Sequence, residues 1–339
     1  MKALLLKEKY QLEMAEYDKP VRGEQEALIR VIAVSVCGSD IHSYKGENAL
    51  LTYPRVMGHE VCGEIAEAPA DGGFLPGDRV VLIPYLNCGH CIACRKGKSN
   101  CCEDLTVYGV HKDGAMAEYI TAPISHLIKI PDGMDARAAA VIEPLAISAH
   151  AVWRAQIHPG ETVLVAGAGP IGLGAAEIAK TYGARVLIAD TDEKRRAFVK
   201  ERFGYEQPLN PLASDYRNLL AELTNGDFPD KIIDSTGNNR SMEANIQNLC
   251  QGGRMVYVGI WQADLTFRHL DFHKREAELV GSRGARREDF LYVIDCIAQK
   301  KLFPERFITH EASFNQSKEA LEEWISKGGE VFKAVITME

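Results

Sequence analysis

Residues 163–190 read VLVAGAGPIGLGAAEIAKTYGARVLIAD, and this stretch decides the fold. An apolar run over residues 162–166 leads directly into GAGPIG at 167–172. Apolar residues then recur at helical spacing as far as Tyr182, and a second apolar run covers residues 185–189. The pattern predicts a strand, a glycine turn, a helix and a second strand, which is the repeating unit of a doubly wound parallel sheet.

The three glycines of this turn have different physical roles. Gly167 permits a tight turn, Gly169 lets a pyrophosphate approach the backbone, and Gly172 lets the helix pack closely on the strand. Free N–H groups and the positive dipole end at the start of the helix favour phosphate binding. The alternative is an ordinary strand-to-helix turn with spare glycines. The residues expected to bind a dinucleotide are Gly167, Gly169, Pro170, Ile171, Gly172, Asp190 and Arg195.

Asp190 ends the second apolar run. A carboxylate at this place can accept hydrogen bonds from both hydroxyls of an adenosine ribose, whereas a 2′-phosphate would meet a like charge. We therefore expect NAD, and not NADP, as the cofactor.

The composition is that of a soluble globular protein. The chain has 339 residues, 46% of them hydrophobic and 25% charged, which is long enough for two domains. Its net charge of −8 argues against general nucleic-acid binding. The start, MKALLLKEKYQLEMAEYD, has too short an apolar stretch for a signal peptide, and no segment has the ~18 apolar residues of a membrane span. We expect a cytoplasmic protein.

The order of patterns along the chain predicts an α/β protein with one domain inserted into another. Residues 27–36 alternate in part between apolar and polar side chains. Glycines separate short apolar runs over 58–81, as in a compact barrel-like β domain. Helical spacing begins after Asp135. Further strands are expected at 231–234, 254–259, 278–281 and 331–337. We predict a β-rich domain over 1–148 and 289–339, interrupted by a dinucleotide-binding domain over 149–288.

Cysteines are concentrated in one short segment. Five of the nine lie within residues 88–102, and disulfides are unusual in a reducing compartment. The sequence CGHCIAC at 88–94, followed by Cys102, supplies the thiols of Cys88, Cys91, Cys94 and Cys102. Four thiolates around zinc leave no position for substrate, so such a site only stabilises its loop. His90 and Cys101 are competing ligands, and redox thiols are the alternative interpretation.

A second set of possible ligands is scattered along the chain: Cys37, His59, Glu60 and Glu143. Each is unremarkable alone, because a cysteine in a β segment is usually a small core residue and an acid in a turn is usually solvated. Together a thiolate, an imidazole and a carboxylate suit a catalytic zinc, since they leave a position for water or an alcohol oxygen.

Six motifs, in this order, resemble the zinc-dependent medium-chain dehydrogenases and, within them, the polyol, sugar-acid and threonine dehydrogenase branch. They are CGSDIH at 37–42, GHEVCG at 58–63, PGDRV at 76–80, the four-cysteine segment with Gly97 and Asn100, EPL at 143–145, and GAGPIG at 167–172. The resemblance covers about residues 25–290. It implies a GroES-like catalytic domain, with a structural-zinc lobe at about 85–105, and an inserted Rossmann domain.

The resemblance also implies the ligands of the catalytic zinc. Cys37 and His59 are direct ligands in this interpretation. Glu60 is a third ligand or one that exchanges with water, and Glu143 reaches the zinc directly or through water. Whether Glu60 or Glu143 binds directly stays open.

Two further residues gain roles from the resemblance. Ser39 matches a hydroxyl that takes the substrate proton, and His42 matches an outer relay to solvent, although an exposed loop histidine is the alternative. The family pattern also favours Cys102 over Cys101 as the fourth ligand of the lobe.

The implied activity is oxidation of a secondary alcohol of a polyol, sugar acid or related hydroxy compound to a ketone, with hydride transfer to NAD. Two zinc ions per chain are implied, one catalytic and one structural. Threonine or a simple secondary alcohol is the alternative substrate, and an NAD-binding regulator without turnover is the alternative class. The run of Arg283, Arg286 and Arg287 suits either a substrate carboxylate or phosphate or a solvated surface.

The resemblance implies a small-molecule substrate, bound in the cleft between the domains, and no nucleic-acid or membrane partner. It also implies a homodimer or homotetramer that pairs through sheet edges of the nucleotide domain. The apolar stretch 254–259, followed by Ile260 and Trp261, suits such pairing.

Overall fold

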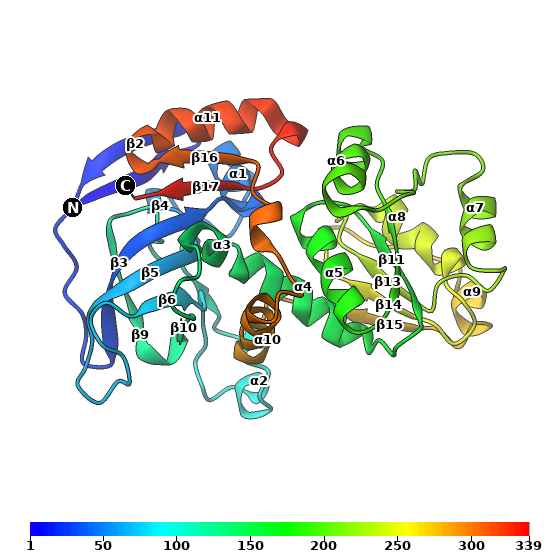
Figure 1. Ribbon diagram of the computed structural model, residues 1–339, viewed down its shortest axis with the longest axis horizontal. Coiled ribbons are helices and arrows are strands. Elements are labelled where there is room, and N and C mark those ends of the chain that lie inside the picture. The colour runs from blue at the N-terminus through cyan, green and yellow to red at the C-terminus, as the bar shows by residue number, and fades with distance from the viewer. Residues whose placement is uncertain (339) are drawn as a thin grey trace. The chain divides into compact units, whose positions relative to one another are not determined.

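The computed structural model describes residues 1–338, which form two compact units (Figure 1). One unit comprises Met1–Glu143 together with the chain from Arg286 onward, and the other comprises Pro144–Ala285. The second unit is therefore inserted into the sequence of the first. The domain limits expected at residues 148 and 288 stay predictions.

The inserted unit is built on a parallel sheet with the strand order β12-β11-β13-β14-β15. The strands are β11 (Thr162–Ala166), β12 (Arg185–Ala189), β13 (Lys231–Asp234), β14 (Arg254–Tyr257) and β15 (Glu278–Gly281). The strands expected at 231–234 and 278–281 are confirmed. The strand expected over 254–259 is confirmed as far as Tyr257, where the chain leaves the sheet.

Helices cover both faces of this sheet, as the alternation of its side chains requires. Helix α5 contacts β11, β12 and β13. Leu164 and Ile232 belong to a core that also contains Leu220 of α7 and Ile246. The helices of the unit are α5 (Pro170–Thr181), α6 (Glu193–Phe203), α7 (Tyr216–Leu223), α8 (Asn239–Ala244) and α9 (His269–His273), and α4 (Ile142–Ala155) leads into it.

The subunit pairing expected for the stretch from residue 254 to Trp261 cannot use the backbone edge of β14, and pairing by the rest of the stretch stays a prediction. Strand β14 is paired on both sides, with β13 and β15, so its backbone offers no free edge. Among the described strands, β12 and β15 end the order of this sheet. The apolar character of β14 is that of a strand buried inside a parallel sheet, whereas Ile260 and Trp261, which follow it, are exposed.

The first unit contains a mostly antiparallel sheet with the order β10-β6-β5-β3-β17-β16, to which β9 adds by pairing with β3. Its strands are β3 (Glu26–Ser35), β5 (Glu60–Glu67), β6 (Arg79–Leu82), β9 (Tyr119–Pro123), β10 (Leu127–Lys129), β16 (His310–Ser313) and β17 (Ala334–Thr337). A smaller sheet has the order β2-β1-β4, formed by β1 (Lys2–Glu8), β2 (Gln11–Glu16) and β4 (Arg55–Val56). A short pair joins β7 (Tyr85–Leu86) to β8 (Thr106–Val107).

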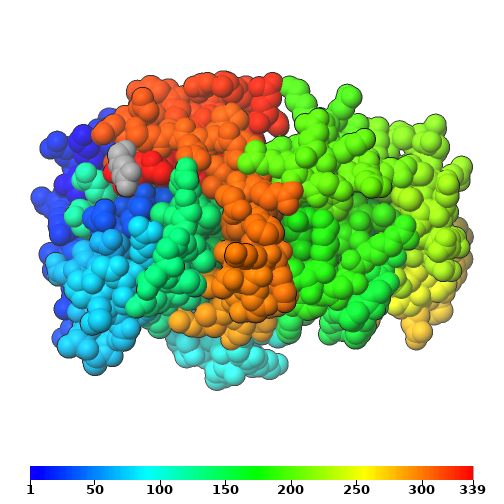
Figure 2. All heavy atoms as spheres, viewed as in Figure 1, coloured from blue at the N-terminus to red at the C-terminus, as the bar shows by residue number. Residues whose placement is uncertain are grey.

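The end of the chain returns to the middle of this sheet. Strand β17 pairs antiparallel with β3 and parallel with β16. In Figure 2 the orange and red C-terminal residues lie against the blue N-terminal ones, consistent with the contact between α11 (Ser317–Lys327) and β2. The strand expected over 331–337 is confirmed in its second half, and its return brings residues just before β17 to the ends of β3 and β5.

Short helices complete this unit. They are α1 (Gly38–Lys45), α2 (Ile92–Arg95), α3 (Ala136–Ala140) and α10 (Arg287–Ala298). The helical pattern expected after Asp135 is confirmed, but it divides at Val141 into α3 and α4. Within residues 1–338, every helix is too short or too polar to cross a bilayer.

Candidate functional site

Cys37 and His59 come together at the ends of two elements of the first unit. Cys37 immediately precedes α1, and its backbone N–H donates to Asp40 Oδ2 at 2.9 Å, which caps the helix. His59 and Glu60 lie where β5 begins. One potential ligand atom from each of Cys37, His59 and Glu60 lies within 4.8 Å of the others.

Asp40 lies beside the imidazole of His59. It is buried, and its Oδ1 is 3.9 Å from His59 Nδ1. Burial alone would lower the pKa of His59, but the negative charges of Cys37, Asp40 and Glu143 raise it well above the usual value. At this distance Asp40 acts on the ring through its charge, and Nδ1 of His59 has no hydrogen-bond partner in the described residues. Negative potential at the ring also favours a bound cation.

Glu143 has one carboxylate oxygen without a partner. It lies in the first turn of α4 and is buried. The Tyr85 phenol donates to Oε1, whereas Oε2 is buried and has no hydrogen-bond partner in the described part of the chain. Burial raises the pKa of Glu143 to about 7. An unsatisfied buried oxygen costs free energy, so Oε2 is suited to bind a metal ion, a water or a substrate hydroxyl.

Two residues that the sequence analysis missed hold Glu60. Lys333 Nζ lies 2.6 Å from Glu60 Oε1 and also contacts Oε2, which the Ser35 hydroxyl contacts as well. All three side chains are buried. Burial alone would lower the pKa of Lys333, but the negative charge of Glu60 raises it. A signal for Lys333 was present in the sequence, because it is a lone charge in the run VFKAVIT.

Tyr85 was also missed, and its sequence neighbourhood carries no comparable signal. It begins the short strand β7 and is brought to Glu143 by tertiary structure alone. Burial, followed by the negative charge of Glu143, raises the pKa of Tyr85 well above its usual value. Tyr85 is therefore a neutral donor that fixes one oxygen of Glu143.

Ser39 and His42 lie three residues apart on α1 and therefore on neighbouring turns of one face. Ser39 is half-buried, and His42 is exposed. The Nδ1 of His42 lies 2.8 Å from Glu47 Oε2. His42 thus sits on a helix and not in a loop, with a carboxylate of the surface as its partner.

The donor set fits a zinc ion with an open coordination position. A thiol, an imidazole and carboxylates within reach of one another are the ligands of catalytic zinc sites. The unsatisfied Oε2 of Glu143 is a second, independent indication of a bound group. Cys37 and His59 could hold the ion, with Glu60 or Glu143 as the third ligand.

The four cysteines of the lobe also converge. The sulfurs of Cys88, Cys91, Cys94 and Cys102 all lie within 4.8 Å of one another. The backbone N–H of Cys88 donates to Cys102 Sγ at 3.2 Å, and that of Cys91 donates to Cys88 Sγ at 3.3 Å. Such hydrogen bonds stabilise thiolates. This geometry fits a closed tetrahedral zinc site.

The competing ligands of the lobe lie differently. Cys101 is exposed, and no metal-ligand grouping in the described residues includes it. His90 is exposed and could join Cys88 and Asp104 in an alternative group of three. Its Nδ1 instead lies 2.9 Å from the carbonyl of Cys88. The four-thiol set is the more buried and the better matched to zinc.

The glycine turn has the expected local geometry. Gly167 has φ +94°, a conformation that side chains rarely adopt. A Cβ at Gly172 would lie 1.8 Å from the carbonyl oxygen of Gly167, so only glycine fits between helix and turn. At Gly169, which caps α5, the nearest atom to a Cβ would be Arg195 Nη1 at 3.7 Å. Pro170 then starts the helix with its fixed φ. Space is therefore available where a pyrophosphate would approach.

Asp190 follows β12 and is buried. Its Oδ2 accepts from the N–H of Ala168 at 2.6 Å and its Oδ1 from that of Asp192 at 2.8 Å. Arg195 Nη1 lies 3.8 Å from Oδ2. Asp190 thus ties the glycine turn to the end of β12, and each oxygen keeps a lone pair for a ribose hydroxyl.

Two arginines of the basic run, Arg286 and Arg287, make contacts within the protein. Arg287 Nη1 donates to the carbonyls of Ser125 and Leu127 at 3.2 and 3.1 Å. Arg286 is the residue before α10, and its guanidinium lies 3.6 Å from Asp289. These contacts favour a structural role over recognition of a substrate anion.

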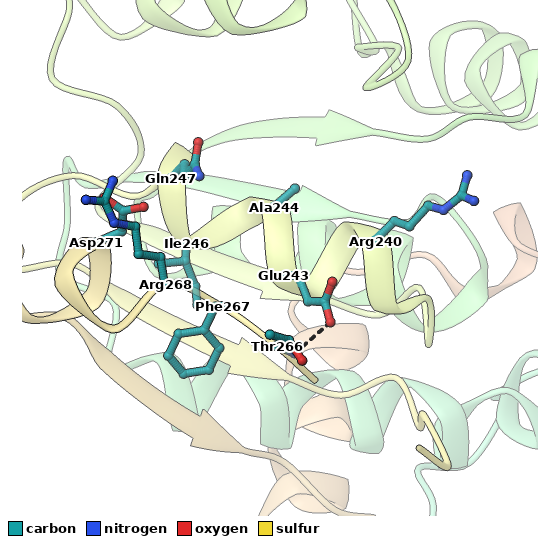
Figure 3. Close-up of a pocket in the computed structure, with 9 residues that line it drawn as sticks. All are labelled: Arg240, Glu243, Ala244, Ile246, Gln247, Thr266, Phe267, Arg268 and Asp271. Carbon is teal, nitrogen blue, oxygen red and sulfur yellow. Dashed lines mark hydrogen bonds between the residues drawn. The ribbon is translucent and has the colours of Figure 1, made fainter. Parts of the chain in front are cut away.

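A surface cavity of about 380 Å³ lies in the inserted unit, between α8 and the segment that leads into α9 (Figure 3). It is lined by Arg240, Glu243, Ala244, Ile246, Gln247, Thr266, Phe267, Arg268 and Asp271. The N–H of Thr266 donates to Glu243 Oε1 at 2.7 Å across it. None of the site residues expected from the sequence lines this cavity.

Two family models match the chain. The model described as alcohol dehydrogenase GroES-like domain matches residues 23–132, and the model described as zinc-binding dehydrogenase matches residues 170–299.

Relatives match over nearly the whole chain. L-galactonate-5-dehydrogenase of Escherichia coli K12 is 43% identical over 99% of this chain and 99% of its own length. Sorbitol dehydrogenase of Halalkalibacterium halodurans is 34% identical over 95% of this chain and 94% of its own. The crystal structure of the alcohol dehydrogenase RspB from Escherichia coli CFT073, complexed with NADH, matches with a TM-score of 0.92 and 31% identity over 100% and 99% of the two chains.

Proposed function

Because the chain belongs to the zinc-dependent medium-chain dehydrogenases, we propose that it uses zinc and NAD to oxidise a secondary alcohol of a polyol or sugar acid to a ketone. The family confirms the expected GroES-like and Rossmann fold, the expected oxidoreductase class, and the expected zinc and nicotinamide cofactors.

One observation in the first unit carries the proposal. Ligand atoms of Cys37, His59 and Glu60 lie within 4.8 Å of one another, although the three residues come from separate segments. The buried Oε2 of Glu143 has no partner in the described residues. A purely structural cluster would satisfy its polar atoms internally, whereas this one is built to receive a ligand.

When bound, zinc supplies a Lewis acid that lowers the pKa of a substrate hydroxyl toward neutrality. Ser39, half-buried on the first turn of α1, accepts the hydroxyl proton. His42, on the next turn, passes the proton to solvent with Glu47 beside its ring. Glu143 is oriented by Tyr85, which donates to its Oε1 and leaves Oε2 for the metal or its bound water.

In the inserted unit, the backbone of the glycine turn and the start of α5 bind the pyrophosphate. Asp190 accepts hydrogen bonds from the adenosine ribose, which disfavours a 2′-phosphate and selects NAD. Arg195, whose side chain is 41% exposed and lies 3.8 Å from Asp190, is free to contact a phosphate.

The substrate class rests on the relatives. The L-galactonate-5-dehydrogenase at 43% identity points to an aldonate, and the sorbitol dehydrogenase at 34% points to a sugar alcohol. Both substrates carry neighbouring secondary hydroxyls. We place a sugar acid first, because the more similar relative acts on one.

The test is NADH formation, followed by its near-ultraviolet absorbance, against a panel of aldonates, polyols, threonine and simple secondary alcohols. We expect turnover of an aldonate or polyol with NAD, much less with NADP, and loss of turnover after chelation that added zinc restores. Turnover of threonine, and of no aldonate or polyol, would contradict the proposed substrate class and favour threonine as the substrate. Absence of turnover on the whole panel, from protein that contains zinc, would favour the regulator instead.

We further propose a cytoplasmic homodimer or homotetramer. The thiols of the lobe and of Cys37 fit a reducing compartment. Strand β15 ends the strand order of the parallel sheet, so its backbone groups can pair with the same strand of a second copy. Mass measurement in solution, with a proline placed in β15, tests this arrangement.

A further inference from the structure

Two groups of possible metal ligands in the lobe share one residue, Cys88. The first is the set of four thiols already described, and the second joins Cys88 to His90 and Asp104. In the second group, too, one ligand atom of each residue lies within 4.8 Å of the others. The groups also meet at Cys102, whose sulfur accepts hydrogen bonds from the backbone of Cys88 and of Asp104. An ion held by one group is therefore next to the other.

Burial increases from the second group to the first. His90 and Asp104 are exposed, and Cys88 is half-buried. Cys91 and Cys102 of the four-thiol set are buried, with exposed fractions of 7% and 1%. The shared sulfur of Cys88 thus belongs both to a group that faces water and to a group that is largely closed to it. An ion that arrives from solvent meets the exposed ligands first.

The ring of His90 is prepared to bind a metal through one nitrogen. Its Nδ1 lies 2.9 Å from the backbone carbonyl oxygen of Cys88. A carbonyl oxygen only accepts, so Nδ1 carries the proton, and Nε2 of the neutral ring keeps a lone pair. Metal-binding histidines are commonly oriented in this way. The guanidinium of Arg95 donates to the carbonyl oxygen of His90 and so holds the same turn.

Exchange of the ion is the step that a closed site makes difficult. Four thiolates leave no coordination position open, so an ion enters or leaves only while some of the thiolates are detached. Imidazole nitrogen and carboxylate oxygen are both zinc ligands and can replace detached thiolates while Cys88 stays bound. Four soft thiolates hold zinc more strongly than one thiolate with an imidazole and a carboxylate. The second group therefore passes the ion on and does not retain it.

We propose that Cys88, His90 and Asp104 form a transfer site, through which zinc moves between solvent and the four thiols of the lobe. Cys88 stays bound throughout, while Nε2 of His90 and the carboxylate of Asp104 are exchanged for the other three thiolates. Only metal–ligand bonds break and form, and each thiol gives its proton to water as it binds. The inference concerns the lobe alone, so its test needs no substrate and does not depend on the proposed reaction.

The experiment follows zinc transfer from the purified holoenzyme to a chromogenic chelator, and zinc uptake once the lobe has been emptied. The lobe zinc is the fraction that Cys94→Ser abolishes. His90→Asn removes the ligand nitrogen, while its amide can still donate to the carbonyl of Cys88. We expect His90→Asn to slow release and uptake of the lobe zinc by the same factor, ~10-fold, the size that the loss of a group beside a metal site produces. The zinc affinity and the Tm should stay unaltered.

A purely structural role of His90 predicts the opposite sign. Loss of a contact that only stabilises the loop would speed zinc release, weaken zinc binding and lower the Tm. Release from His90→Asn that is as fast as from wild type, or faster, overturns the proposal.

Asp104 provides a second test with a matched control. Asp104→Asn should slow release and uptake in the same way, and Asp104→Glu, which keeps a carboxylate, should recover most of the rate. The control is Glu103→Gln, at the adjacent exposed acid, which belongs to neither group of ligands in the described residues. It removes the same charge and should leave both rates unaltered. Equal slowing in Asp104→Asn and Glu103→Gln would mean that charge, and not ligation, speeds the transfer, which contradicts the proposal.

The same preparation separates this inference from the proposed function. Absence of any bound zinc that depends on Cys94 would refute the transfer site, because the lobe would then hold no ion to exchange. Absence of turnover, with the lobe zinc present and its release slowed in His90→Asn, would refute only the proposed function.

Discussion

The two clusters of metal-ligand residues in the first unit are built in opposite ways. The lobe takes all four thiols from residues 88–102, a segment held by short turns and the brief helix α2. The other cluster takes Cys37 from before α1, His59 and Glu60 from the start of β5, and Glu143 from α4. The first site needs only its own loop, whereas the second needs the whole sheet to be formed.

This difference decides what each site can do. Four thiolates complete the tetrahedral shell of the ion and leave it no other partner. Ligands that come from separate elements are fixed by those elements, so they can leave a coordination position for substrate, and Glu143 there keeps an unsatisfied oxygen. Four predictions test the contrast, from the largest expected effect to the smallest.

Cys37→Ser should abolish most of the activity while the fold survives. We expect kcat/KM to fall by roughly 10³-fold, because the several kcal/mol of charge stabilisation supplied by the metal is lost. Zinc content should drop from two ions per chain to one. Steady-state kinetics and elemental analysis measure both. The control is Cys62→Ser, at a buried cysteine of β5, which should keep both ions. Retained zinc-dependent turnover in Cys37→Ser would exclude the ligand role.

Cys94→Ser should act on stability instead. Opening the lobe removes a structural metal, and we expect the free energy of unfolding to fall by about 4 kcal/mol or more. Thermal and denaturant unfolding of the holoprotein measure this loss. Cys101→Ser, at the exposed neighbour of Cys102, should change neither stability nor zinc content. Equal effects of the two substitutions would mean that the ligands of the lobe are misassigned.

Glu143→Gln should flatten the pH dependence of stability in the metal-free protein. Burial raises the pKa of Glu143 to about 7 from a usual 4.5, so folding favours its protonated form. That contribution is fully present below the unfolded-state pKa and is lost as the pH rises through about 7. The loss amounts to roughly 3 kcal/mol, and glutamine, which stays neutral, should avoid it.

Urea unfolding of chelator-treated protein on either side of this pH window gives the measurement. The exposed Glu24→Gln should follow the wild type throughout. If Glu143→Gln loses as much stability as the wild type over the same window, the buried carboxylate is not the titrating group.

His42→Gln should have the smallest effect. The side chain is 63% exposed, so water can replace it in passing a proton to solvent. We expect kcat to fall by only about 5-fold, less than the ~100-fold or more of a buried general base. Added imidazole should restore part of the rate. His111→Gln, at another exposed histidine, should leave kcat unchanged. A loss as large as that of Cys37→Ser would place His42 within the site.

Much of the fold could be predicted because its signals are local. The apolar runs of β13 and β15 matched their strands, since buried parallel strands are short apolar segments bounded by turns. The turn at Gly167 could be recognised because its φ of +94° and the contact at Gly172 both demand glycine. The break between α3 and α4 was missed, because alanine-rich sequence favours helix on both sides of Val141.

The site was predictable in part. Residue types and a family resemblance selected Cys37, His59, Glu60 and Glu143, but neither indicated what surrounds them. Tyr85, Ser35 and Lys333 were missed, since a tyrosine, a serine and a lysine acquire a role only from what they contact.

The sequence by itself determined the elements and motifs that local spacing encodes: the glycine turn, the parallel strands and the four-thiol loop. The tertiary structure alone decided which oxygen of Glu143 remains unsatisfied and which cation holds Glu60. The physical reason is strand register. Ser35 faces Glu60 on one side and the strand that follows Lys333 on the other, and hydrogen bonds between strands far apart in the chain set that alignment.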